Sequence, residues 1–179
     1  MSARTVLHQA DIARALTRIS HEILESNRGA DDLVILGIPT RGVLLAERVA
    51  GLVSQISGQD IPFGALDVTL YRDDLGRHPT RNPQPSRIPA GGVDGKTVVL
   101  VDDVLFSGRT IRAALDALGD YGRPRVVRLA ALIDRGHREL PIRPDFVGKN
   151  LPSALDERIN VRLTELDGDE YVSIEGADA

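Results

Sequence analysis

One segment, residues 98–110, constrains the fold of this chain more than any other. Residues 98–101 are four consecutive aliphatic residues, which is typical of a strand buried on both faces of a parallel sheet. The adjacent carboxylates Asp102 and Asp103 follow, where we expect this strand to end, and a turn of small residues comes after them. Apolar residues then recur at helical spacing, namely Ile111, Ala114, Leu115 and Leu118. The segment therefore predicts strand, acidic pair, turn and helix in direct succession.

The chemistry of this succession suits a sugar phosphate. Ser107, Gly108 and Thr110 stand at the expected start of the helix, where backbone N–H groups and the positive end of the helix dipole attract a phosphate. The carboxylates of Asp102 and Asp103 can accept hydrogen bonds from the vicinal hydroxyls of a ribose. A ribose 5-phosphate therefore fits the predicted geometry.

This arrangement resembles the phosphoribosyl-pyrophosphate motif of type I phosphoribosyltransferases, an acidic pair after four aliphatic residues and before x-x-x-Ser/Thr-Gly-x-Thr. The resemblance implies that Asp102 and Asp103 are catalytic and lie near a Mg²⁺ ion that arrives with the phosphates of the substrate. It also implies that the motif binds phosphoribosyl pyrophosphate (PRPP) or a nucleotide through Asp102, Asp103, Val104, Leu105, Phe106, Ser107, Gly108, Arg109 and Thr110.

The bulk composition is that of a single globular domain spanning residues 1–179, with 42% hydrophobic and 27% charged residues. The chain has no cysteine, which excludes a disulfide framework and a thiolate metal site. The N-terminus shows no apolar signal segment, and no apolar run approaches the ~18 residues of a spanning helix. We therefore expect a cytoplasmic protein without a membrane partner. A net charge of −4 argues against a globally basic nucleic-acid binder but leaves a local basic patch open.

Hydrophobic periodicity predicts alternating strands and helices. Helices are expected at residues 11–26 (capped by Asp11), 44–53 and 111–118; strands at 33–38, 66–71, 97–102 and 126–133; and a hairpin of 160–166 with 171–174. Such alternation predicts an α/β fold with a mostly parallel sheet flanked by helices. Its ligand should lie beyond the carboxyl ends of the strands.

Two further segments carry expected site residues. Thr40 and Arg41 follow the first buried strand, and the type I family holds the pyrophosphate leaving group at this place, which implies that Arg41 is catalytic and neutralises that charge. Residues 72–95 are rich in Pro, Gly, Asn, Asp and Arg, and a loop of this length is functional or disordered. They correspond in position to the family's mobile loop, in which Arg72 and Arg81 would face the reaction centre, although a solvated linker is the alternative.

Position 106 bears on the identity of the base. Oxopurine members of the type I family carry an Asp there, which handles the imidazole proton of the purine. This chain carries Phe106 instead, so hypoxanthine and guanine are disfavoured as substrates. Adenine and the pyrimidines remain open on this argument.

Four more segments, residues 15–22, 37–42, 70–75 and 134–143, together resemble the PyrR family of bacterial pyrimidine-operon regulatory proteins. The likeness runs from about residue 8 to residue 175 and implies two functions. One is a uracil phosphoribosyltransferase that makes UMP and pyrophosphate from uracil and PRPP. The other is a regulator that binds pyrimidine operon leader mRNA when UMP or UTP is bound.

The same resemblance implies a homodimer or larger homo-oligomer and a small hood over the base. The hood would comprise residues from about 134 to 179 together with the N-terminal segment. Its members closest to uracil would be Arg135, Asn160 and Val161.

A polar, mostly basic face runs along the first predicted helix, where Arg14, Thr17, Arg18 and His21 recur at three, four and seven residues. On the sequence alone this face is either solvated surface or an RNA interface. The family resemblance implies RNA binding by this face, since Thr17 and His21 match positions that the family uses against RNA. Arg18 lies on the same face, and Arg143 and Lys149 would extend the RNA-binding patch. Ser26 stands where a relative commonly carries a basic residue, and the alternative reading is a type I phosphoribosyltransferase with no RNA-binding role.

Overall fold

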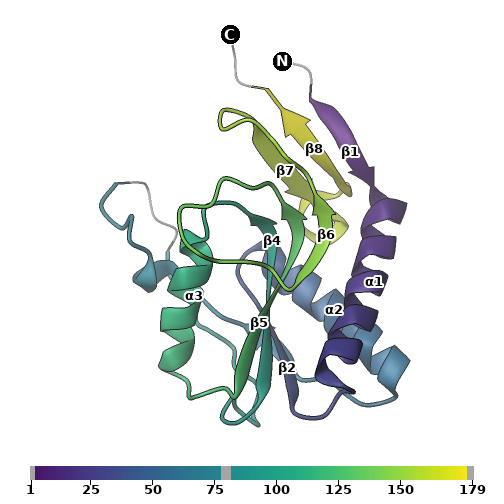
Figure 1. Cartoon of the computed structure of the whole chain (residues 1–179), viewed down its shortest axis with the longest axis vertical. Coiled ribbons are helices and arrows are strands. Elements are labelled where there is room, and N and C mark those ends of the chain that lie inside the picture. Colours follow the sequence, from purple (N-terminus) through teal and green to yellow (C-terminus); the bar gives the residue numbers. More distant parts are fainter. Residues whose placement is uncertain (1–2, 78–81, 177–179) are drawn as a thin grey trace.

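The computed structural model describes residues 3–77 and 82–176 and is built around a parallel sheet (Figure 1). The five strands lie in the order β3-β2-β4-β5-β6 and are all parallel. Their bounds are β2 (Leu33–Gly37), β3 (Phe63–Ala65), β4 (Thr97–Leu105), β5 (Val126–Asp134) and β6 (Phe146–Asn150). The predicted α/β class and mostly parallel sheet are thus confirmed.

Three helices cover the two faces of this sheet. Helices α1 (Gln9–Asn27) and α2 (Arg41–Ser57) pack on one face and α3 (Arg109–Gly119) on the other (Figure 1). The alternation of β4 explains both layers, since Val99 and Val101 join the core beneath α1 and α2 while Val98 and Leu100 join the core beneath α3. No helix within the described ranges combines the length and apolar character needed to cross a membrane.

Both ends of the chain meet in a second, antiparallel sheet, called here the small sheet. It consists of β1 (Arg4–His8), β8 (Tyr171–Glu175) and β7 (Arg158–Arg162), in that order (Figure 1). The predicted pairing of the last two strands is confirmed. Their connection is longer than a tight turn, because the short helix α4 (Thr164–Asp167) intervenes and Gly168 ends it with φ +78°.

Two predicted boundaries are wrong. Helix α1 begins earlier than expected, with His8 as its N-cap; Asp11 stands in the first turn, where its Oδ2 accepts the His8 N–H at 2.9 Å. Strand β4 continues to Leu105, so Asp102 and Asp103 lie within the strand instead of after it. The extra residues stay extended because β4 keeps pairing with β5 up to the Leu105–Asp134 register.

The prediction of a strand at residues 66–71 is also wrong. The extended segment is β3, which ends at Ala65, and Thr69–Tyr71 form a 3₁₀ turn, η1. The side chain of Asp67 explains the change, since its Oδ1 accepts hydrogen bonds from the N–H (3.2 Å) and hydroxyl (2.7 Å) of Thr69. Such an Asx turn competes with an extended backbone.

Residues 72–95 have little regular structure where they are described, and parts of them are anchored. Arg87 exchanges two backbone hydrogen bonds with Ala65, at 2.8 and 3.0 Å, and Val93 is fully buried. The described part of this segment is therefore attached to the domain on its C-terminal side. Arg81 lies outside the described residues.

Candidate active site

Two adjoining cavities open at the carboxyl ends of β2 and β4. The smaller measures about 630 Å³ and is bordered by residues 104–110, and the larger measures about 1020 Å³ and is bordered by Thr40 and Asp103. Five residues border both, namely Arg72, Asp74, Asp102, Val104 and Thr110. The structure thus brings together the motif, the turn after the first strand and the start of the 72–95 segment, as expected for a ligand at this edge of a parallel sheet.

The acidic pair lies between the two cavities. Asp102 is 8% exposed, and its Oδ1 accepts the N–H of Asp103 at 2.9 Å. The half-buried Asp103 accepts the N–H of Val104 through its own Oδ1 at 2.8 Å. Burial raises the pKa of Asp102 well above its ordinary value, and the neighbouring carboxylate of Asp103 raises that pKa further. Hydroxyl donors or a cation at this place would relieve the cost of the buried charge.

The donor set at the acidic pair suits a hard cation that brings its own ligands. Asp102 and Asp103 offer carboxylate oxygens, which Mg²⁺ prefers. Among the described residues there is no cluster of three or more His, Cys, Asp or Glu side chains that could enclose a metal. The residues therefore fit a Mg²⁺ ion held partly by substrate oxygens, and they do not fit a protein-only cage.

The turn that joins β4 to α3, residues 106–110, presents its amides for an anion. Gly108 is the N-cap of α3 and adopts φ +93°, a conformation that favours glycine. Within the described part of the chain, the N–H groups of Ser107, Gly108 and Thr110 donate no hydrogen bond to another protein group. These groups and the positive end of the α3 dipole form a suitable phosphate site. We call residues 106–110 the phosphate turn.

The turn before α2 approaches β4 closely because of two glycines. A Cβ on Gly37 would lie 2.3 Å from the carbonyl oxygen of Gly42, and a Cβ on Gly42 would lie 2.5 Å from that of Val101. Thr40 borders the larger cavity, whereas the neighbouring Arg41 borders neither.

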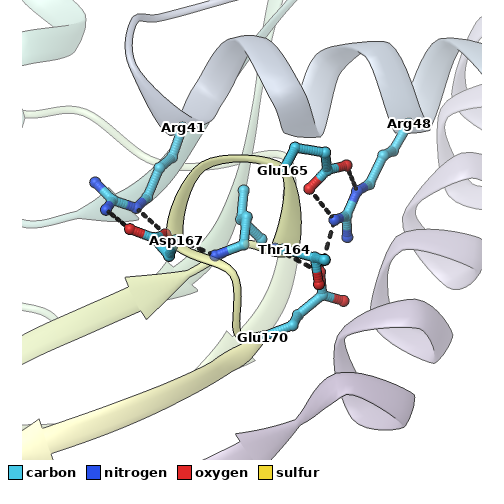
Figure 2. Close-up of polar contacts among 7 residues, drawn as sticks. Arg41, Arg48, Thr164, Glu165, Asp167 and Glu170 are labelled. Atoms are coloured by element: carbon cyan, nitrogen blue, oxygen red, sulfur yellow. Dashed lines mark hydrogen bonds and ion pairs between the residues drawn. The ribbon is translucent and has the colours of Figure 1, made fainter.

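Arg41 points instead toward helix α4, which connects β7 to β8, and there it meets Asp167 (Figure 2). Its Nη2 lies 2.7 Å from Asp167 Oδ1 and its Nε 3.2 Å from Oδ2, and this pairing lowers the pKa of Asp167. Asp167 Oδ2 also accepts the N–H of Leu163. Arg41, which was expected to neutralise the pyrophosphate leaving group, is thus paired with a carboxylate of the protein.

A second arginine of α2 strengthens this attachment of α4 (Figure 2). Arg48 donates to Glu165 through Nε (2.9 Å) and Nη2 (2.6 Å), and its Nη2 also donates to Glu170 at 2.6 Å. These hydrogen bonds raise the pKa of Arg48 and lower that of Glu165. Together with the Arg41–Asp167 pair they form the α2–α4 clamp, which holds Glu165 at the rim of the larger cavity. The sequence analysis missed the clamp, whose partners are more than a hundred residues apart.

Phe106 rests against residues of the segment that follows β5. The guanidinium carbon of Arg135 lies 4.3 Å from the centroid of the Phe106 ring, and the His137 ring meets it edge-on at 5.9 Å. Arg135 itself is 8% exposed and donates to Ser153 Oγ (2.9 Å) and Ala154 O (2.7 Å). Of the predicted hood residues, Arg135 thus reaches the phosphate turn.

The other two predicted hood residues lie on β7 and border neither cavity as the structure describes them. The side chain of Val161 is 5% exposed and belongs to the core beneath α1 and α2. Asn160 is half-buried and pairs in register with Ser173 of β8. Their contact with a base stays a prediction.

The predicted RNA-binding face of α1 is exposed and packs beside β6. Thr17 and His21 are exposed, as are Arg143 and Lys149, and Lys149 belongs to β6. Arg18 is also exposed, yet its guanidinium donates to the carbonyl oxygens of Val147 (3.0 Å) and Gly148 (2.6 Å) and pairs with Glu22 at 2.8 Å. The structure thus packs α1 against β6, with Arg18 joining the two elements.

Comparisons with known proteins agree with this geometry. The family model described as the phosphoribosyl transferase domain matches residues 2–164. Bifunctional protein PyrR of Leifsonia xyli subsp. xyli is 70% identical over 98% of this chain and 98% of the relative. Bifunctional protein PyrR of Streptomyces coelicolor is 64% identical over 95% of this chain and 88% of the relative.

Among solved structures, the hypoxanthine phosphoribosyltransferase of Trypanosoma cruzi superposes with a TM-score of 0.73 over 98% of this chain and 97% of that chain. At 13% identity this match shows the fold alone, and it confirms the predicted type I phosphoribosyltransferase fold. By the family match and the high identity to its relatives, the chain belongs to the phosphoribosyltransferases and, among them, to the family of bifunctional PyrR proteins.

Proposed function

We propose that this chain is a uracil phosphoribosyltransferase and a pyrimidine-responsive regulator that binds operon leader mRNA when UMP or UTP occupies its site. One observation carries the enzymatic part: the phosphate turn, the acidic pair and the Thr40 turn border two cavities that share Asp102 and Thr110. One PRPP molecule could contact all three. Membership in the bifunctional PyrR family supports both parts of the proposal.

The residues divide the work of phosphoribosyl transfer among them. The open amides of the phosphate turn hold the 5-phosphate, and the carboxylates of Asp102 and Asp103 accept the ribose hydroxyls. The bond between C1 and the pyrophosphate oxygen breaks, positive charge develops on the ribose ring, and the bond from uracil N1 to C1 forms with loss of the N1 proton. Negative charge on the acidic pair favours that developing cation.

Asp102 and Asp103 would hold a Mg²⁺ ion, which would supply positive charge to neutralise the pyrophosphate leaving group. Thr40 borders the cavity where the pyrophosphate would lie. The guanidinium of Arg41 is engaged by Asp167, so its predicted role requires that the leaving group compete with a carboxylate at 2.7 Å. Backbone groups of the turn can meet the leaving group without that exchange.

Residues 72–95 would exclude water while the cation exists. Arg72 borders both cavities and pairs with Asp74 at 2.7 Å. Asp73 pairs with Arg109 of α3 at 2.6 Å, which places the first residues of the segment over the phosphate turn. The predicted contribution of Arg81 stays outside the described residues.

The experiment for the enzymatic part is a comparison of bases. With PRPP and Mg²⁺, we expect the chain to convert uracil to UMP and to leave hypoxanthine and guanine nearly untouched, because Phe106 offers no carboxylate for a purine proton. Turnover of guanine at the rate of uracil would show that position 106 has been misinterpreted.

For the regulatory function, we propose that RNA binds to the exposed side of α1 and to residues in and before β6. Its contacts would be Thr17, His21, Arg143 and Lys149. Basic side chains on RNA phosphates make affinity fall with salt. A gel shift with pyrimidine leader RNA should show tighter binding when UMP is present. The second candidate function is a transferase that does not bind RNA. One observation favours it: the guanidinium of Arg18 already donates to two carbonyl oxygens of β6. No RNA binding with or without UMP would support this second candidate.

For the remaining attributes, we propose a cytoplasmic location and a homodimer or larger homo-oligomer. Family membership supports both. Light scattering during size-exclusion chromatography measures the oligomeric state directly.

A further inference from the structure

The carbonyl side of the phosphate turn is held by residues 134–142, which begin at the last residue of β5 and are called here the backing segment. The N–H groups of Glu139 and Leu140 both donate to the carbonyl oxygen of Ser107, at 2.9 and 3.2 Å. A Cβ built on Gly108 would lie 3.1 Å from the side chain of Ile142. The turn is therefore packed and hydrogen-bonded on one side while its amides stay open on the other.

The side chain of Arg138 forms hydrogen bonds both within the backing segment and with the phosphate turn. Arg138 donates through Nη1 to the carbonyl oxygen of Phe106 (2.8 Å), through Nε to that of Ile142 (2.8 Å) and through Nη2 to Asp134 Oδ2 (2.7 Å). Its side chain is 23% exposed and that of Asp134 15%. Asp134 is itself fixed, since its Oδ1 accepts the N–H of Gly136 at 3.0 Å.

The direction of these bonds gives Arg138 a role in ligand binding. A peptide unit whose carbonyl is held on one side presents its N–H on the other, because the two groups point in opposite directions in a planar trans peptide. The carbonyl of Phe106 shares a peptide unit with the N–H of Ser107, and the carbonyl of Ser107 shares one with the N–H of Gly108. The first is held by Arg138 and the second by the backing segment that Arg138 shapes.

We propose that Arg138 is a positioning residue for phosphate recognition: it orients the Ser107 and Gly108 amides toward the 5-phosphate without touching the ligand. This inference rests on the proposed function, since it assumes that the phosphate turn holds a ribose 5-phosphate. Arg138 borders neither cavity as described, in keeping with action through the backbone.

The test compares two ligands that differ only in the phosphate. UMP engages the phosphate turn, whereas uridine leaves it empty, so the ratio of their affinities isolates recognition at the turn. Calorimetry on the full chain should show this ratio falling at least ten-fold in Arg138→Gln, with uridine affinity changed less than three-fold. A ten-fold loss corresponds to about 1.4 kcal/mol.

Two further variants make the result decisive. Arg138→Lys keeps a charge for Asp134 but cannot reach three acceptors at once, so its ratio should fall between wild type and Arg138→Gln. Arg123→Gln is the matched control, because Arg123 precedes β5 at the opposite end of the sheet. Its ratio should equal that of wild type. If Arg138→Gln fails to fold by circular dichroism, the Arg138→Lys ratio decides alone.

Equal losses of UMP and uridine affinity, or an unchanged ratio in a folded Arg138 variant, would overturn the positioning role. A different outcome would overturn the proposed function instead, namely wild-type protein that binds UMP no more tightly than uridine. The two failures are therefore distinguishable within one set of titrations.

Discussion

Replacing Asp102 by Asn should stabilise the fold and weaken the binding of PRPP. The carboxyl of Asp102 is 8% exposed and lies beside Asp103, and both burial and this neighbour raise its pKa. The native state therefore holds the Asp102 proton more tightly than the unfolded chain does. Below the ordinary Asp pKa of about 3.9 both states are protonated and the group has no effect. As pH rises toward the raised native pKa, the unfolded chain ionises first, and the cost to stability grows until it is complete above that pKa.

The asparagine keeps the shape of the side chain and its Oδ1 acceptor for the Asp103 N–H, yet carries no charge at any pH. Relief of an unfavourable active-site group commonly contributes about 0.5–2 kcal/mol. For a chain of this length each kcal/mol raises Tm by about 2–4 °C. A charge-assisted hydrogen bond to a ribose hydroxyl is worth about 1.5–3 kcal/mol, so PRPP affinity should fall about ten- to a hundred-fold.

Thermal unfolding between pH 4 and pH 8 and calorimetry with PRPP and Mg²⁺ measure both effects. The Tm advantage of Asp102→Asn should be largest near pH 8 and vanish toward pH 4. Asp116→Asn on the exposed face of α3 is the control and should change neither quantity. An Asp102→Asn protein that is less stable than wild type at pH 8, or that binds PRPP equally well, would refute the reasoning.

Other parts of the structure give further expectations. Proteolysis within residues 72–95 should slow when PRPP and Mg²⁺ are added, because the segment would close over the ligand; equal cleavage with and without ligand would count against closure. Replacing Thr17 and His21 together by Ala should weaken RNA binding and flatten its salt dependence while uracil turnover stays near wild type, and a loss of both activities would indicate a folding defect. Arg48→Ala should lower the free energy of unfolding by about 1–3 kcal/mol, because Glu170, whose side chain is 5% exposed, would lose its cation. Denaturant unfolding measures that loss, and an unchanged midpoint would show that the α2–α4 clamp adds no stability.

The fold was predictable where its signals are local. The four aliphatic residues at the start of β4 and the apolar spacing of α3 each determine one element, and the small turn between them is a recognisable motif. The prediction of a strand at 66–71 was wrong for an equally local reason, because the Asp67 side chain accepts hydrogen bonds from Thr69 and favours a turn over an extended backbone. Strands β1 and β6 went unpredicted, since each is only five residues long and includes polar or exposed positions.

The residues of the candidate site also differ in whether local sequence signals could predict them. The acidic pair, the phosphate turn and Thr40 could be named from the sequence, because the rule for parallel sheets places all of them at one edge. The partners of Arg41 and Arg138 could not. The first lies 126 residues away, and the second is a main-chain carbonyl at Phe106, which no side-chain pattern encodes. The role of Arg18 in joining α1 to β6 escaped for the same reason, since its acceptors are backbone carbonyls 129 and 130 residues away.

The most direct test of the central claim is the appearance of product. The full chain should be incubated with uracil, PRPP and Mg²⁺, and UMP and pyrophosphate should be quantified by chromatography and phosphorus NMR. We predict that both appear in equal amounts, and that a folded protein carrying both Asp102→Asn and Asp103→Asn forms them far more slowly. Absence of UMP with the wild-type chain, or a double variant as active as wild type, would contradict the assignment of uracil phosphoribosyl transfer to this site.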